Sequence, residues 1–146
     1  APWENRDSLL VAKQQFINDL SDNYKEMEKF GITKVNAQFF LPPYEWYNDE
    51  ISKWTNELGL TLINFTFGTS SNTDYTIPSM GEKYLDSETI YNNILSYESI
   101  STNGLNGFLL LVHIGTHPER TDKFYYKLDN LINELQTRGY SFTYFK

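Results

Sequence analysis

The chain has 146 residues, a length that fits one domain with its own apolar core. Its 19 acidic and 12 basic residues give a net charge of -7, which opposes the phosphate neutralisation of non-specific nucleic-acid binding, so we expect no nucleic-acid partner. The absence of cysteine excludes disulfides and thiolate sites, and no apolar run approaches the roughly 20 residues of a membrane span, so we expect no membrane partner.

Helices and strands are predicted to alternate along the chain. Apolar residues at three- and four-residue steps predict a first helix over residues 7–30, with Asp7 or Ser8 as its cap, and an apolar run predicts a strand at 35–41. The later pairs are a helix at 48–58 with a strand at 60–67, a helix at 87–97 with a strand at 108–114, and a helix at 122–138 with a strand at 140–145.

Glycine separates three of the helices from the strands that follow, at Gly31, Gly59 and Gly139, because a residue with positive φ commonly ends a helix. Parallel neighbouring strands need a long return connection, which the helices supply. The sequence therefore predicts a single α/β domain over residues 1–146, with four strands in a parallel sheet and no internal repeat.

Three polar or aromatic connections follow the expected ends of strands. They are residues 41–48, which contain two consecutive prolines, the long stretch 68–85, and residues 113–117. The carboxyl ends of parallel strands commonly carry ligand sites, and long loops are often functional. We therefore expect the three connections to meet at one cleft.

Two histidines lie in the third connection. His113 ends an apolar run, where an imidazole suits proton transfer or is satisfied by a local hydrogen bond. Asp74 in the second connection can orient that histidine or cap its own loop. His117 follows four residues after His113, but Gly115 and Pro118 disfavour a helical His-x-x-x-His metal pair.

Three short motifs resemble one family when they are read together. Pro42-Pro43-Tyr44, Thr73-Asp74-Tyr75 and Leu111-Val112-His113 resemble the later motifs of NodB-type polysaccharide deacetylases, carbohydrate esterase family 4. Gly139-Tyr140-Ser141-Phe142 is similar to the closing turn and strand of that family. The resemblance covers nearly the whole chain and implies the C-terminal part of a distorted (β/α)7 barrel from a bacterial, extracytoplasmic enzyme.

In that family a divalent, zinc-like metal activates a water molecule that attacks an N- or O-acetyl group on a polysaccharide. The resemblance implies that His113 is the general acid, that Asp74 orients it, and that the Tyr44 backbone N–H holds the oxyanion. It places the ring of Tyr75 in the acyl pocket.

Further contacts with the carbohydrate are expected from the first connection. We expect Pro43, Glu45 and Trp46 to bind substrate there. Glu45 has a second interpretation, since an acidic residue also suits the start of the following helix, where its charge complements the helix dipole.

The family motifs that supply the base and the metal ligands have no match in residues 1–30, and Leu41 stands where the family usually has arginine. We therefore expect this chain to be inactive alone and to bind no metal. Since the sequence begins with Ala1, we expect the natural start to lie upstream. The missing N-terminal part of the domain, or a second copy in a homo-oligomer, is the expected partner that completes the sheet.

Two alternatives remain open. The chain can be a non-catalytic carbohydrate-binding or accessory domain in which Trp46, Tyr47, Trp54 and Tyr75 stack on sugars. A flavodoxin-like interaction module is disfavoured because no glycine-rich phosphate loop follows the first predicted strand.

Overall fold

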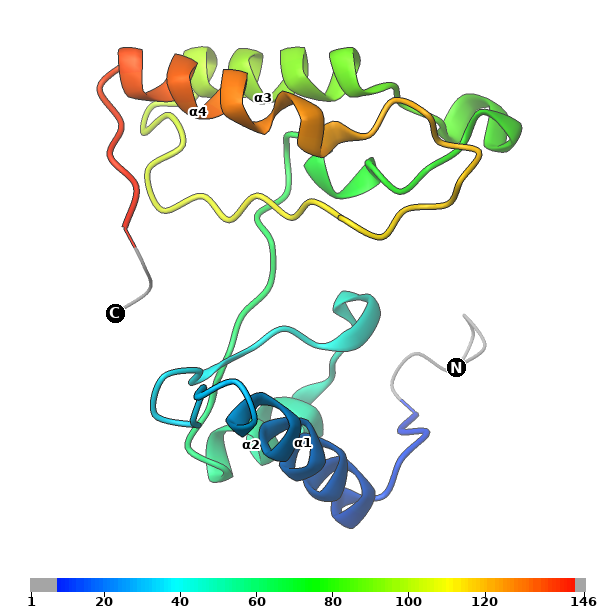
Figure 1. Ribbon diagram of the computed structural model, residues 1–146, viewed down its shortest axis with the longest axis vertical. Helices are drawn as coiled ribbons and strands as arrows, with labels where there is room; N and C mark the ends of the chain where they lie inside the picture. The colour runs from blue at the N-terminus through cyan, green and yellow to red at the C-terminus, as the bar shows by residue number, and fades with distance from the viewer. Residues whose placement is uncertain (1–7, 144–146) are drawn as a thin grey trace. The chain divides into compact units, whose positions relative to one another are not determined.

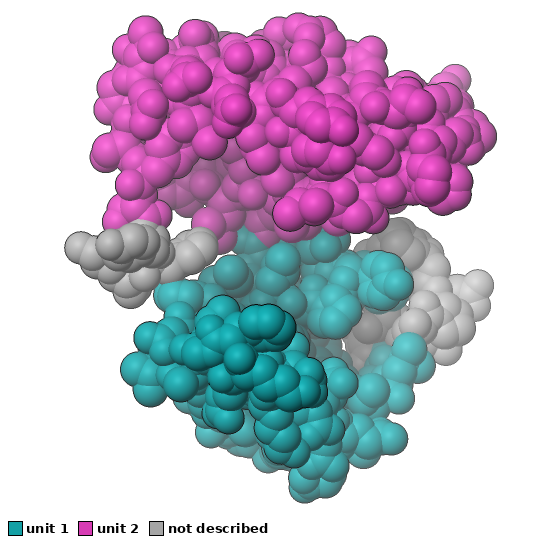
Figure 2. Space-filling model, in the orientation of Figure 1, with its two compact units in different colours: residues 1–64 teal, residues 65–146 magenta. Residues whose placement is uncertain are grey.

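The computed structural model describes residues 8–143. The chain forms two compact units, Ala1–Asn64 and Phe65–Lys146, coloured separately in Figure 2. Each unit has an apolar core of its own, built around Phe16, Leu20 and Leu60 in the first unit and around Ile90, Ile94 and Phe124 in the second. None of the helices within residues 8–143 combines the length and the apolarity that a bilayer span requires.

The first unit contains two α-helices, which are labelled in Figure 1, and a two-stranded parallel sheet. Its elements are α1 (Lys13–Glu28), β1 (Phe39–Phe40), the 3-10 helix η2 (Pro43–Glu45), α2 (Asp49–Glu57) and β2 (Thr61–Leu62). In the sheet, Phe39 pairs with Thr61 and Phe40 pairs with Leu62. Aromatic contacts fix α1 on this sheet and on α2, because the ring of Phe16 lies 5.7 Å from that of Phe40 and 5.9 Å from that of Trp54.

The start of α1 differs from the prediction. Ala12 precedes the helix, and its N–H donates to Oε1 of Gln15 at 2.8 Å. The prediction of Ser8 as the cap is wrong, and Asp7 lies outside the described residues. Leu10 is 72% exposed, so the packing that would extend the helix toward residue 8 is missing.

The second unit is built on two helices that lie side by side in Figure 1. Its elements are η3 (Ser71–Thr73), η4 (Pro78–Lys83), α3 (Ser87–Ile100), η5 (Phe124–Lys127) and α4 (Leu128–Thr137). The core joins Ile90 and Ile94 of α3 to Leu131 and Leu135 of α4.

The predicted helix ends at glycine are confirmed. Ile32 N–H donates to Met27 O, Leu60 N–H to Thr55 O, and Tyr140 N–H to Leu135 O, each closing the last turn across a glycine with positive φ.

The predicted strands are shorter or missing within residues 8–143. The strands predicted at 35–41 and 60–67 form only the two-residue ladder β1–β2, and neither 108–114 nor the described residues of 140–145 form a strand. Phe108, Leu110 and Val112 do pack against the core at every second position, as in a strand. One backbone bond, from Thr66 N–H to Leu109 O at 2.9 Å, is too little for a ladder. The structure is thus α/β only at a coarse level, and no barrel is evident in the described residues.

Candidate functional site

The second unit brings Asp74 and His113 into direct contact. The side chain of Asp74 is fully buried, with 0% of its surface exposed, and its Oδ1 lies 2.6 Å from the Nδ1 of His113. Its Oδ2 accepts a hydrogen bond from the backbone N–H of His113 at 2.7 Å. One buried carboxylate therefore fixes both the backbone and the ring of the histidine, although the two residues are 39 positions apart in the sequence.

This contact determines which ring nitrogen of His113 carries the hydrogen. A carboxylate has only acceptor oxygens, so Nδ1 of His113 is the donor. Nε2 has no hydrogen-bond partner among residues 8–143, and the side chain is 33% exposed. The imidazole thus presents Nε2 outward, in the arrangement by which an acidic residue orients a histidine for proton transfer.

The backbone before Asp74 places its carboxylate. Ser70 has a φ of 58°, which turns the chain into η3, and Thr73 Oγ1 donates back to Ser70 O at 2.7 Å. Asp74 N–H donates to Ser71 O at 3.3 Å, so the residue closes the 3-10 turn with its side chain directed inward. The Asp74 carboxylate therefore contacts His113, as the orienting interpretation requires. The alternative, an exposed carboxylate that caps its own loop, is wrong because the side chain is fully buried.

The ring of Tyr75 forms one wall beside the imidazole. Its centroid lies 5.6 Å from that of His113, and the two planes meet at 73°, an edge-to-face contact. Half of Tyr75 remains exposed. The structure therefore joins three of the sequence-predicted site residues, Asp74, Tyr75 and His113, within one unit.

His117 lies on a different network. Its Nδ1 accepts the backbone N–H of Glu119 at 3.2 Å, so this histidine carries its hydrogen on Nε2 and caps its own loop. The two histidines thus have opposite tautomers. The helical His-x-x-x-His metal pair that the sequence disfavoured does not form.

The other predicted site residues, Pro43, Tyr44, Glu45 and Trp46, lie in the first unit, so the prediction that all three connections share one cleft stays a prediction. Tyr44 and Glu45 both have a φ of 57°, a left-handed conformation that costs about 1–3 kcal/mol for each non-glycine residue. The Tyr44 backbone N–H makes no hydrogen bond within the described residues. An available N–H on a strained turn is compatible with the oxyanion role implied for Tyr44.

Glu45 does not start the following helix. Asn48 caps α2, since its Oδ1 accepts the N–H of Ile51 at 3.0 Å, and the acidic residues in the first turn are Asp49 and Glu50. The helix-start interpretation of Glu45 is therefore wrong. Its backbone oxygen instead accepts the side-chain amide of Asn64 at 3.1 Å, which ties the turn to the end of the unit.

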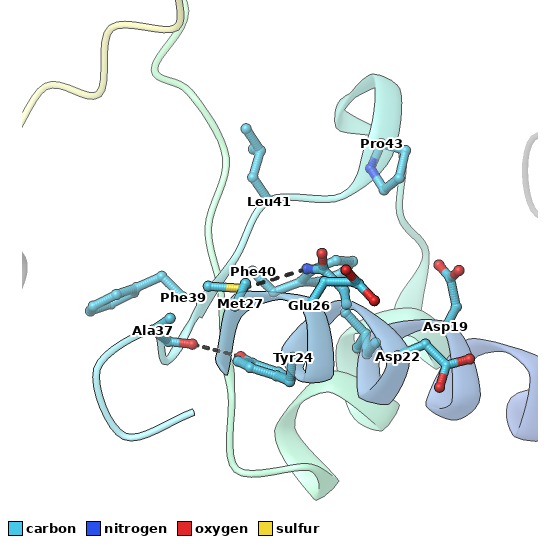
Figure 3. A pocket seen from close by; sticks show the side chains of 12 residues that line it. Asp19, Asp22, Tyr24, Glu26, Met27, Ala37, Phe39, Phe40, Leu41 and Pro43 are labelled. Carbon is cyan, nitrogen blue, oxygen red and sulfur yellow. Dashed lines mark hydrogen bonds between the residues drawn. The ribbon is translucent and has the colours of Figure 1, made fainter. Parts of the chain in front are cut away.

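A groove of about 680 Å³ lies beside Pro43 in the first unit (Figure 3). Its walls come from α1 and from residues 37–43, and a hydrogen bond from Tyr24 to the carbonyl of Ala37 closes one side. Two of its three carboxylates are paired with lysines, Asp22 with Lys25 in α1 and Glu26 with Lys29 directly after that helix. The groove is lined by apolar, polar and acidic residues and contains no histidine, the side chain best suited to proton transfer near neutral pH.

Sequence reasoning missed Asp122, whose carboxylate accepts hydrogen bonds from Tyr84 and Ser87 in the same unit. Burial alone would raise the pKa of Asp122, but the Ser87 N–H, the Tyr84 hydroxyl and the Arg120 guanidinium outweigh it and hold that pKa below its ordinary value. The pKa of Tyr84 is raised, mainly by burial and secondly by the hydrogen bond that its hydroxyl donates to Asp122. In the sequence these residues read as a polar, solvated loop, and no pattern marks them.

The described residues do not fit the metal that the resemblance implies. Within residues 8–143 no three His, Cys, Asp or Glu side chains are grouped so that they could hold a metal ion. The Nδ1 atoms of both histidines already have other partners. Comparison of the chain with known protein families, with curated proteins and with solved structures finds no significant match.

Proposed function

We propose that this chain is the C-terminal part of a metal-dependent polysaccharide deacetylase, with acetylated carbohydrate as its substrate. The observation that carries the proposal is the contact of the buried Asp74 carboxylate with Nδ1 and with the backbone N–H of His113. The Leu-Val-His and Asp-Tyr motifs that resemble the family meet at this contact. The extracytoplasmic location and the bacterial source belong to the same proposal.

In this function His113 is the general acid. Protonated at Nε2, it donates that proton to the amine or alcohol that leaves as the C–N or C–O bond to the acyl carbon breaks. Asp74 holds Nδ1–H and stabilises the imidazolium form before the transfer. Tyr75 supplies an apolar edge beside the imidazole, which suits the methyl group of an acetyl substituent.

The attacking water requires a base and a metal, and residues 8–143 contain no group of three His, Cys, Asp or Glu side chains that could hold the metal. We propose that an upstream stretch of the natural polypeptide, or a partner copy, provides them and completes the sheet. The isolated chain is then inactive. Leu41, in place of the family arginine, removes one usual partner of that base, so the complete enzyme orients its base by another contact.

The test compares two histidine variants in the complete polypeptide encoded by the source gene. Acetate release is measured with chitin oligosaccharides and with an O-acetylated polysaccharide, in the presence of zinc. We expect His113→Ala to lower kcat by about 10²–10⁴-fold, the usual contribution of a general acid. The matched control His117→Ala, in a loop-capping histidine, should stay within about twofold of the parent. Absence of acetate release from the parent, or equal rates for both variants, would refute the proposal.

A non-catalytic carbohydrate-binding role is the second candidate. It is favoured by the aromatic side chains Tyr44, Trp46 and Tyr47 after β1, which are 85%, 48% and 51% exposed. Exposed rings suit the apolar faces of sugars. Calorimetry with chitin oligosaccharides would test it, with Trp46→Ala expected to weaken binding and the exposed, non-aromatic Leu10→Ala expected to leave it unchanged. Absence of binding heat with the parent chain excludes this role.

A further inference from the structure

Residues 69–87 and 113–123 of the second unit are joined by hydrogen bonds at several points besides Asp74 and His113. Ser79 N–H donates to Glu119 Oε1 at 3.0 Å, and Tyr84 O–H donates to Asp122 Oδ1 at 3.0 Å. Ser87 N–H donates to Asp122 Oδ2 at 2.6 Å. Because nearly all of these links join loop residues rather than strands, the position of Asp74 relative to His113 depends on side chains and not on a sheet ladder.

Arg120 lies at the centre of these links and is completely buried. Its Nη1 donates to the backbone oxygen of Thr76 at 2.7 Å, and its Nη2 donates to Ser87 Oγ at 3.1 Å. The guanidinium also lies 5.4 Å from the ring centroid of Tyr84, a cation–π distance. Its nearest carboxylate oxygen is Asp122 Oδ1, 3.8 Å from Nε.

A fully buried guanidinium is unusual, because removing a cation from water costs several kcal/mol before its partners offset that cost. Its fork geometry lets one side chain hold two acceptors at a fixed separation, which lysine cannot do. Here the two acceptors belong to the loop that carries Asp74 and to the first turn of α3. The residue therefore fixes the loop to α3, whose Ile90 and Ile94 are fully buried in the core.

The link from Arg120 to Asp74 runs through one turn of backbone. Thr76 N–H donates to Thr73 O at 2.9 Å, and Thr76 Oγ1 donates to the same oxygen at 2.7 Å. Asp74 lies inside this turn. A shift of the Thr76 carbonyl consequently moves the Asp74 carboxylate away from the backbone N–H and the Nδ1 of His113, which donate hydrogen bonds to it.

We propose that Arg120 is a positioning residue: it holds Thr76, and through the turn at residues 73–76 it keeps Asp74 on Nδ1 of His113. The proposal rests on the proposed function only for its catalytic consequence. Its structural content concerns the tautomer of His113, which can be measured without substrate, metal or a complete enzyme.

The test measures the ring tautomers of both histidines by long-range ¹H–¹⁵N NMR, above the pH range in which imidazoles titrate. The parent chain should show His113 with hydrogen on Nδ1 and His117 with hydrogen on Nε2. In Arg120→Met and Arg120→Lys we expect His113 to become a mixture of tautomers while His117 is unchanged. Far-ultraviolet circular dichroism verifies that each variant is folded.

Arg138→Met is the matched control, because Arg138 also pairs with carboxylates, those of Glu98 and Glu134, in the same unit. It should leave the His113 tautomer unchanged. If Arg120→Met does not fold, Arg120→Lys decides, since it keeps the buried charge and removes the fork that holds Thr76 and Ser87 at a fixed separation. Folded Arg120 variants that keep His113 entirely protonated on Nδ1 would overturn the proposal.

Activity of the complete polypeptide separates this proposal from the deacetylase proposal. We expect Arg120→Lys to lower kcat by about 10–100-fold with little change in KM, the effect of a small displacement of a catalytic group. A changed tautomer in a polypeptide whose parent releases no acetate leaves the positioning role standing and refutes the deacetylase. If the parent releases acetate and Arg120→Lys leaves the His113 tautomer unchanged, the deacetylase proposal stands and the positioning role of Arg120 is refuted.

Discussion

Replacing Asp74 with asparagine should change the hydrogen position on His113 without changing the shape of the site. The backbone N–H of His113 can only donate, so the asparagine oxygen should face it and the amide NH₂ should face the ring. Nδ1 must then accept, and its hydrogen moves to Nε2. Asp74→Asn is therefore expected to give His113 the tautomer that His117 already has.

The energetic cost follows from the two hydrogen bonds and from the buried charge. Each hydrogen bond to the carboxylate contributes about 1.5–3 kcal/mol, and a neutral one contributes about 0.5–1.5 kcal/mol. Two such exchanges lose about 2–3 kcal/mol, and relief of the buried charge offsets part of this loss. We expect the free energy of unfolding of the second unit to fall by about 1–3 kcal/mol in Asp74→Asn, and by about 3–5 kcal/mol in Asp74→Ala.

Both histidines of the chain lie in the second unit, so their ring signals report on that unit during a urea titration. The tautomer is read from the same NMR samples before urea is added. A folded Asp74→Asn variant that keeps hydrogen on Nδ1 of His113, or a cost below about 0.5 kcal/mol, would refute the reasoning.

Three further predictions concern the second unit. Gly68→Ala should cost about 2 kcal/mol or more in urea unfolding, because its φ is 127° and a Cβ would lie 2.5 Å from the Tyr97 ring, whereas Gly115→Ala, with open space, should stay within about 0.5 kcal/mol. Ile94→Ala should cost about 2–5 kcal/mol and the exposed Ile100→Ala almost nothing, measured in the same way. The pKa of Asp122 is lower in the folded chain, so its stabilisation is present above about pH 4 and is lost as pH falls through the folded pKa. Acid titration followed by circular dichroism should therefore show that folded structure is lost less steeply with falling pH in Asp122→Asn than in the parent. Equal slopes for the two proteins would contradict this.

The helices could be predicted from the sequence because apolar spacing and terminal glycines act locally. Gly31, Gly59 and Gly139 end helices where expected, and the apolar positions of α3 and α4 form the core of the second unit. The strands could not be predicted in the same way. An apolar run such as 108–113 packs against the core whether or not a neighbouring strand completes its hydrogen-bond ladder, and the sequence alone does not identify that neighbour.

The site was predictable only in part, for a related reason. His113 could be named because it ends an apolar run, and Asp74 because it lies in a long polar connection; both belong to motifs that resemble the deacetylase family. Arg120 and Asp122 could not, since a run of charged residues usually marks a solvated loop. The burial of Arg120 arises from contacts over more than 30 sequence positions, with Thr76 and Ser87, and such contacts leave no local pattern.

Exposure alternates along Asp74-Tyr75-Thr76, since the outer two residues are buried and hydrogen-bonded while the ring between them faces solvent. A different side chain at position 75 would change the wall beside His113 without disturbing the anchored backbone. Under the proposed deacetylase function, directed evolution toward other acyl groups should therefore begin at position 75, whose ring is half exposed.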